Sequence, residues 1–220
     1  MADILADDVV SFLRTAGPEG DAVLSEMDDY AEREGFPHVG PEVGGFLRLL
    51  VRLTGAERVF EFGSGYGYSA YWFAGALSEG DEIVLTEVDA DELAMARGYM
   101  DRGGFDAEVR YELGDAIETV DGYEGPFDAV LIDNEKYRYR EAFDAVREKL
   151  APGSVVIADN MLVANTVYYD DVGRLLRGES VDATESARGI AAYLERVRSD
   201  PDCETSVLPI GEGIAVTHVR

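Results

Sequence analysis

Glu-Phe-Gly-Ser-Gly-Tyr-Gly-Tyr-Ser, residues 61–69, ends a short apolar run that begins at Arg58. Glycine lets the backbone turn sharply and approach a ligand where a Cβ would clash. In a parallel α/β sheet, ligands bind beyond the carboxyl ends of the strands. We therefore predict a strand that ends at Phe62, a ligand-binding glycine loop and then a helix. The alternative is a tight strand–helix turn that binds nothing.

Short apolar runs alternate with helical patterns on the C-terminal side of this loop. The expected strands cover residues 58–62, 82–87, 108–112, 129–132 and 154–158. The expected helices lie near residues 67–79, 90–102, 115–120 and 138–150. This alternation is typical of parallel strands with helices on both faces of the sheet.

The two ends of the chain complete the predicted fold. A helix is expected from residue 182 to about Ser199, and two strands, 205–208 and 213–219, follow it. Their tight connection makes these two strands antiparallel. We predict one domain, 1–220, with a helical cover over 1–56 and a doubly wound, Rossmann-like α/β core over 57–220.

The composition is strongly acidic. The 220 residues include 19 Lys and Arg against 45 Asp and Glu, a net charge of −26, and the only lysines are Lys136 and Lys149. Such a surface repels polyanions, which argues against non-specific binding to nucleic acid or anionic lipid. An acidic, lysine-poor chain suits a salt-rich cytoplasm, where salt screens charges beyond about 3 Å at 1 M. We hypothesise a halophilic source; the alternative is an ordinary acidic enzyme.

Nothing in the sequence directs the chain out of the cytoplasm. Cys203 is the only cysteine, so no intrachain disulfide is possible and a zinc site would need other ligands. Residues 1–8 lack a basic segment followed by an apolar one, which argues against a signal peptide. No apolar run has the length needed to span a bilayer. We expect a cytoplasmic protein.

The glycine loop favours a cofactor other than a dinucleotide. The fingerprint Gly-x-Gly-x-x-Gly needs a glycine where Tyr68 stands, so an NAD oxidoreductase is disfavoured. Glu87, at the end of the second expected strand, can accept hydrogen bonds from both hydroxyls of a ribose, and Asp89 is its rival. Between residues 63 and 101 the only base is Arg97. A ribose without phosphates, as in S-adenosylmethionine (SAM), fits these residues.

Oxygen-bearing side chains follow two apolar runs. Asp133 ends residues 127–133, and Asp159 with Asn160 ends residues 155–160. If the two strands are neighbours, about 4.8 Å apart, these side chains converge. Two carboxylates and an amide suit a hard cation such as Mg²⁺ and do not suit zinc. For each acid taken alone, the alternative is a cap or turn residue.

Lys136 lies three residues after Asp133, so its amine can reach back over the ion. A neighbouring cation and partial burial favour the neutral amine, which can take a proton. Arginine stays charged and cannot act as a base. Lys136 is therefore the candidate catalytic base, and the alternative is a solvated lysine on a helix face.

These motifs together resemble the cation-dependent O-methyltransferases, the family of catechol and caffeoyl-CoA O-methyltransferases. The similarity runs from about Pro37 to the C-terminus. Beyond the glycine loop, the segments that carry it are 86–89 (Thr-Glu-Val-Asp), 133–136 (Asp-Asn-Glu-Lys), 158–160 (Ala-Asp-Asn) and 208–213 (Leu-Pro-Ile-Gly-Glu-Gly).

The resemblance implies an enzyme that uses SAM and a divalent cation. It implies that Asp133, Asp159 and Asn160 bind the metal and that Lys136 is the base. It implies that Val39, Gly63, Ser69, Glu87, Asp115, Ala116 and Asp133 contact SAM. We add Glu61 and Gly65 from the glycine loop to this set. Asp115 can also cap the following helix.

The sequence departs from the family on the acceptor side, at Glu135, Asn165 and residues 188–191, so the acceptor cannot be carried over. The aromatic residues that could form walls around a planar acceptor, or simply pack, are Tyr66, Tyr68, Trp72, Tyr168 and Tyr169. We expect a small-molecule hydroxyl acceptor, catechol-like or a vicinal diol, and a homodimer. The alternatives are methylation of a hydroxylated tRNA base and a SAM-binding module without catalysis.

Overall fold

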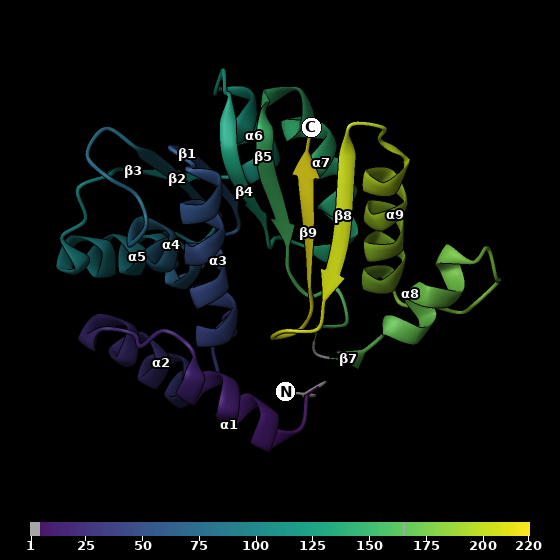
Figure 1. The fold of residues 1–220 in the computed structure, drawn as a ribbon, viewed down its shortest axis with the longest axis horizontal. Helices are drawn as coiled ribbons and strands as arrows, with labels where there is room; N and C mark the ends of the chain where they lie inside the picture. Colours follow the sequence, from purple (N-terminus) through teal and green to yellow (C-terminus); the bar gives the residue numbers. More distant parts are fainter. Residues whose placement is uncertain (1–4, 165) are drawn as a thin grey trace.

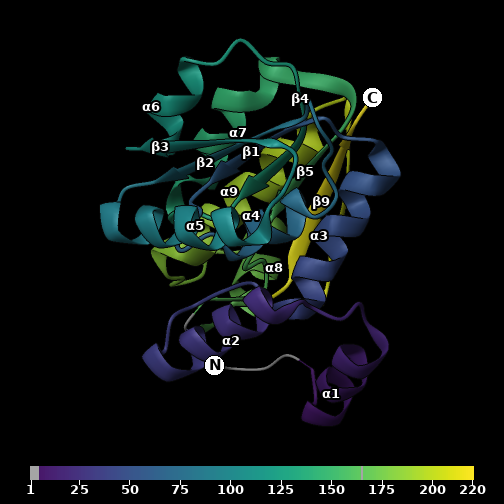
Figure 2. The same cartoon turned by 90° about the vertical axis from the view of Figure 1, so that its left-hand side faces the viewer.

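The chain begins with three helices that precede the sheet. The computed structural model describes residues 5–164 and 166–220, so Asn165 lies outside the described residues. The first helices are α1 (Asp7–Ala16), α2 (Ala22–Glu34) and α3 (Gly40–Thr54). Figure 2 shows α1 and α2 beneath the sheet and its flanking helices, as expected of a helical cover.

A seven-stranded sheet follows, with the strand order β3-β2-β1-β4-β5-β9-β8 (Figure 1). The strands are β1 (Arg58–Phe62), β2 (Glu82–Glu87), β3 (Glu108–Leu113), β4 (Phe127–Ile132), β5 (Leu150–Ala158), β8 (Cys203–Leu208) and β9 (Ile214–Val219). Strands β1 to β5 pair in parallel, whereas β9 runs antiparallel to both β5 and β8. The predicted fold class is confirmed.

Helices cover both faces of the sheet. Besides α3, they are α4 (Tyr68–Ala74), α5 (Ala90–Gly103), α6 (Ala116–Asp121), α7 (Tyr139–Val146) and α9 (Glu185–Ser199), and α8 (Tyr169–Leu176) packs on α9. Successive strand residues point to opposite faces, so Val59 joins the core beneath α3, α4 and α5, while Phe60 joins the core beneath α6, α7 and α9. Both faces of β1, β2 and β4 are buried, which explains why these strands are largely apolar, whereas the edge strand β3 is partly exposed and alternates polar with apolar residues.

Some predicted boundaries were wrong. The helix expected over 67–79 ends at Ala74, next to Gly75. The helix expected over 138–150 is α7 with a 3₁₀ turn at each end, η1 (Lys136–Arg138) and η2 (Arg147–Lys149). Neither α8 nor the small hairpin of β6 (Val163–Ala164) and β7 (Thr166–Val167) was predicted. Val172 of α8 is buried and Leu175 and Leu176 pack against the same core, but the helix has only eight residues, and contact with α9 supports it.

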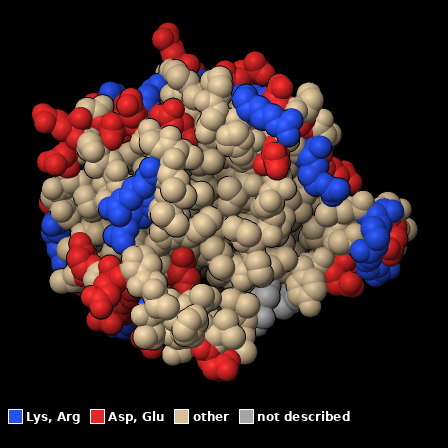
Figure 3. Space-filling model, viewed as in Figure 1, with Lys and Arg blue, Asp and Glu red and all other residues tan. Residues whose placement is uncertain are grey.

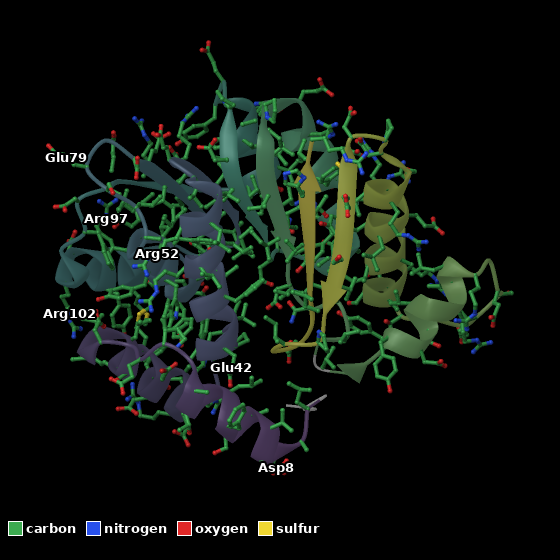
Figure 4. All side chains as sticks on the ribbon, in the orientation of Figure 1. Asp8, Glu42, Arg52, Glu79, Arg97 and Arg102 are labelled. Atoms are coloured by element: carbon green, nitrogen blue, oxygen red, sulfur yellow. The ribbon has the colours of Figure 1, made fainter. Side chains whose placement is uncertain are left out.

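The cover is attached by polar contacts as well as apolar ones. The Tyr71 hydroxyl donates to Asp21 at 2.7 Å, and Arg102 of α5 forms an ion pair with Glu26 of α2. Arg14 of α1 pairs with Glu42 of α3 at 2.6 Å. Figure 4 labels Arg102 beside α2 and Glu42 above α1. These contacts hold the segment that precedes α3 against the sheet domain.

Charge is unevenly distributed over the surface. Acidic and basic side chains surround the face seen in Figure 3, whereas the area over α3, β9 and β8 is largely uncharged. No helix in the described part of the chain combines the length and the apolar character needed to cross a membrane.

Candidate active site

One cavity of about 1040 Å³ lies at the carboxyl ends of the parallel strands. Its wall is built from the segment before α3, the glycine loop and the ends of β2 to β5, with α9 and the β8–β9 turn closing one side. This is where parallel α/β sheets bind ligands. The predicted site residues that line it are Val39, Gly63, Gly65, Ser69, Glu87, Asp115, Ala116, Asp133, Lys136, Asp159 and Asn160.

Glycine is required in the loop after β1. Gly63, Gly65 and Gly67 have φ values of 83°, 50° and 89°, in the left-handed region that favours glycine. A Cβ on Gly63 would lie 2.9 Å from the carbonyl oxygen of Asp133, and one on Gly67 would lie 2.8 Å from the Cβ of Ala96. The loop can therefore pass close to β4 and α5 only without side chains.

Glu87 faces this loop from the end of β2. Its Oε2 accepts a hydrogen bond from the Gly65 amide at 2.8 Å, and its Oε1 accepts from the amides of Val88 and Asp89. Asp89 instead caps α5 by accepting from the amides of Asp91 and Glu92, and it does not line the cavity. The geometry therefore favours Glu87 over Asp89 as the carboxylate for a ribose.

Asp115 caps a helix and also faces the cavity. It caps α6 through the Ile117 amide at 2.8 Å, and it lines the cavity. Arg138 of η1 donates to its Oδ2 at 2.5 Å. Burial raises the pKa of Asp115, but the hydrogen bonds from Arg138 and the Ile117 amide outweigh burial and lower it. This ion pair links the end of β3 to the turn that carries Lys136.

The oxygen-bearing residues converge between β4 and β5. Ile132 pairs with Ala158, so Asp133 and Asp159 extend from adjacent strand ends. The Lys136 amine donates to Asp133 Oδ1 at 2.9 Å and to the carbonyl oxygen of Asn134 at 3.1 Å. Lys136 is therefore at the predicted position, next to the acid cluster and on the cavity wall.

Asp159 is a buried acid with an unpaired oxygen. It is 4% exposed, and its Oδ1 has no hydrogen-bond partner. Burial, and then the charge of Asp133, hold the pKa of Asp159 well above its usual range. Such a carboxylate favours a neighbouring cation. Residues 5–164 and 166–220 contain no metal-like cluster of three or more His, Cys, Asp or Glu, so the fit to a hard cation depends on two carboxylates and the Asn160 amide.

Comparison with known proteins decides the family of this chain. The O-methyltransferase family model matches residues 21–219. The chain belongs to the O-methyltransferase family. Catechol O-methyltransferase of Niastella koreensis is 36% identical over 152 residues, which cover 66% of this chain and 68% of that enzyme. Flavonoid 3',5'-methyltransferase of Vitis vinifera is 25% identical, covering 81% and 77%.

A solved structure agrees over nearly the whole chain. The O-methyltransferase from Bacillus cereus, in complex with SAH, superposes with a TM-score of 0.80 at 26% identity and covers 97% of each chain. The predicted resemblance to catechol-type and caffeoyl-CoA-type enzymes is confirmed, and this chain is a SAM-dependent O-methyltransferase.

Some residues predicted for this O-methyltransferase site lie outside the cavity. Glu61 is fully buried behind the loop and accepts a short hydrogen bond from Ser69. Trp72 packs in the core against Gly44, and Tyr168 is buried with its hydroxyl on the carbonyl oxygen of Asn160. Tyr169 is half exposed and also lies off the wall. Packing turns these four side chains away from the cavity, and the sequence alone does not show this.

Two of the aromatic residues considered as acceptor walls, Tyr66 and Tyr68, do line the cavity of the O-methyltransferase. The His38 ring lies against Tyr68, tilted by 54° with centroids 4.4 Å apart. Glu212, in the turn after β8, lines the cavity and accepts a short hydrogen bond from Asn160 Nδ2. Its segment matches the family, which is the signal that could have identified Glu212.

Proposed function

We propose that this O-methyltransferase moves the methyl group of SAM to one hydroxyl of a small catechol-like or vicinal-diol acceptor, with a divalent cation held by Asp133, Asp159 and Asn160. One observation carries the proposal. The unpaired oxygen of buried Asp159 lies next to the Lys136–Asp133 pair, in the same cavity as the glycine loop. Methyl donor and acceptor can therefore meet in one enclosed space.

The cofactor half of the cavity suits SAM. Glu87 accepts hydrogen bonds from the ribose hydroxyls, as a carboxylate with lone pairs free can do. Asp115 and Ala116 border the adenine, while Val39, Gly63, Gly65 and Ser69 surround the remainder of the molecule. The fit depends on the close backbone approach that the glycines permit.

The chain's own residues then prepare the acceptor. A bound divalent cation supplies Lewis acidity that makes an acceptor hydroxyl easier to ionise. Lys136 acts here as the neutral amine: the hydroxyl proton passes to its Nζ, and the Asp133 carboxylate and the Asn134 carbonyl stabilise the resulting ammonium. The acceptor oxygen attacks the methyl carbon as its bond to sulfur breaks, and holding both reactants in line lowers the barrier.

The charges of the wall favour an acceptor without phosphates. Its acids are Glu87, Glu92, Asp115, Asp133, Glu135, Asp159, Glu185 and Glu212. Its two bases, Lys136 and Arg138, are already paired with Asp133 and Asp115. A polyanionic acceptor such as tRNA or a coenzyme A ester would meet this wall with no unpaired cation from the described residues. We therefore rank a free catechol above both.

The test compares variants on a panel of catechols, vicinal diols and total tRNA. Lys136→Arg keeps the positive charge but removes the base, so kcat is expected to fall about 100-fold or more. Asp159→Ala is expected to abolish metal-dependent turnover. Glu79→Gln, in an exposed loop remote from the cavity (Figure 4), is the control.

Three results would contradict this proposal. Full activity in excess EDTA would exclude the metal, and methylation of tRNA alone would favour the nucleic-acid enzyme. Calorimetry that detects SAM binding without turnover of any acceptor would favour a non-catalytic module.

We further propose that the enzyme is one domain and acts in the cytoplasm as a homodimer.

A further inference from the structure

Asn160 has an unusual backbone for its residue type. Its φ is 58°, and no other non-glycine residue of segments 5–164 and 166–220 has a positive φ. Asparagine tolerates this left-handed conformation better than most residues, but the conformation still needs support from its surroundings. Asn160 is 8% exposed and lies on the cavity wall. The surrounding residues must therefore hold the backbone of Asn160 in this conformation.

Two side chains hold Asn160. The Tyr168 hydroxyl donates a short hydrogen bond to the carbonyl oxygen of Asn160. The side-chain Nδ2 of Asn160 donates a short hydrogen bond to Glu212 Oε2. Glu212 is fixed in turn, because its carbonyl oxygen accepts from the amides of Leu162 at 3.0 Å and Val163 at 3.2 Å. The residues after β5 and the β8–β9 turn thus form one connected unit around Asn160.

The chemistry of Glu212 determines which way the amide faces. The Asn160 nitrogen donates to Glu212 Oε2, so the amide presents its nitrogen to Glu212. The amide oxygen then remains free for another partner. Hydrogen bonds of this kind from outside the ligand set orient metal ligands and tune metal affinity.

We propose that Glu212 is a positioning residue, which fixes the side-chain amide of Asn160 so that its oxygen serves the divalent cation of the proposed function. It acts through Asn160 and is not itself a ligand. Replacing it by glutamine removes this control, because a glutamine amide can present either oxygen or nitrogen to Asn160.

The experiment measures Mn²⁺ binding without SAM or acceptor, by electron paramagnetic resonance of free Mn²⁺. Glu212→Gln is expected to raise the Kd about tenfold or more. Glu135→Gln removes the same charge from the same wall, and Glu135 has no side-chain hydrogen bond or ion pair in the described part of the chain. Its Kd is expected to change less than about threefold. Should Glu212→Gln not fold, Tyr168→Phe tests the same unit without any change of charge.

A double-mutant cycle separates positioning from direct ligation. In the Asn160→Ala background, Glu212→Gln is expected to change the Kd by less than about twofold, since its target is gone. An equal loss in both backgrounds, or a Kd for Glu212→Gln within about twofold of the wild type, would overturn the inference. A wild-type enzyme that binds no Mn²⁺ would instead refute the metal site of the proposed function, and this inference with it.

Discussion

Glu61 lies in surroundings that disfavour an ionised carboxylate. It is completely buried, one oxygen accepts from Ser69 and the other has no partner. Burial, with the charges of Asp133 and Glu87 adding to it, raises the pKa of Glu61 to about 8. The protonated form of Glu61 is therefore favoured in the folded enzyme at neutral pH. It supports Ser69 from behind the cavity wall.

This shift makes stability depend on pH. The ordinary pKa of a glutamate is 4.5, so between pH 4.5 and 8 the folded state keeps a proton that the unfolded state releases. Stability therefore falls as pH rises through this window, by on the order of 5 kcal/mol in all. Glu61→Gln should remove that part of the slope in urea unfolding at pH 5, 6, 7 and 8. Parallel curves for the variant and the wild type would contradict the shift.

Site residues were predictable where their position depends on the local chain. Asp133, Asp159 and Asn160 follow apolar strands directly, so knowing the strands places them at one edge of the sheet. Glu212 reaches the site only because β9 pairs antiparallel with β5. Tyr168 turns inward because α8 packs beside α9. Contacts between distant segments decide such orientations, and the sequence pattern does not contain them.

Helix α9 approaches the turn that carries Lys136 without room for a side chain. A Cβ on Gly189 would lie 2.2 Å from the carbonyl oxygen of Lys136 and 2.4 Å from the Cα of Tyr137. Real Cβ atoms are never that close to backbone, so α9 or η1 would have to move. In the sequence, residues 188–191 are only a departure from the family. The close approach of α9 to η1 explains why position 189 is a glycine.

Gly189→Ala should therefore displace the catalytic turn. We expect a loss of about 1–3 kcal/mol in unfolding free energy and a lower kcat, because Lys136 moves relative to Asp133. Gly98→Ala, on the exposed side of α5 with nothing within 4 Å of its Cβ, should instead stabilise by about 0.5–1 kcal/mol. Urea unfolding and steady-state kinetics measure both effects. Equal behaviour of the two variants would show that the close approach is not required.

Elements were predictable in proportion to how much apolar surface their own sequence displays. Strands β1, β2 and β4 are almost wholly buried, so continuous apolar runs reveal them. Strand β5 begins at Leu150, four residues before the expected start. Its first residues are partly exposed and only Leu150 among them pairs with β4, so they show no continuous apolar run. Helix α8 places Val172, Leu175 and Leu176 on one face, but the pattern spans only eight residues and the helix was not predicted.

The uncharged area of Figure 3 bears on the proposed homodimer. A protein of charge −26 repels its own copies over most of its surface, so two copies meet most readily through a neutral face. Leu53 of α3, one of the elements beneath this area, is 73% exposed. Light scattering after size exclusion should show a dimer, and Leu53→Glu should dissociate it. Leu113→Glu, at an exposed leucine of β3, is the control. A monomeric wild type would contradict the dimer.

Net charge also predicts how the whole molecule responds to salt. Folding brings 45 acids close together against only 19 bases, and this repulsion is weakened as the screening length shortens from about 10 Å at 0.1 M to about 3 Å at 1 M. The urea midpoint should therefore rise steeply between 0.1 and 1 M KCl and level off above it. Salting-out of apolar surface would instead continue to stabilise at higher salt. A midpoint that is the same at 0.1 and 1 M KCl would contradict the halophilic hypothesis, because charge repulsion would then contribute nothing measurable to stability.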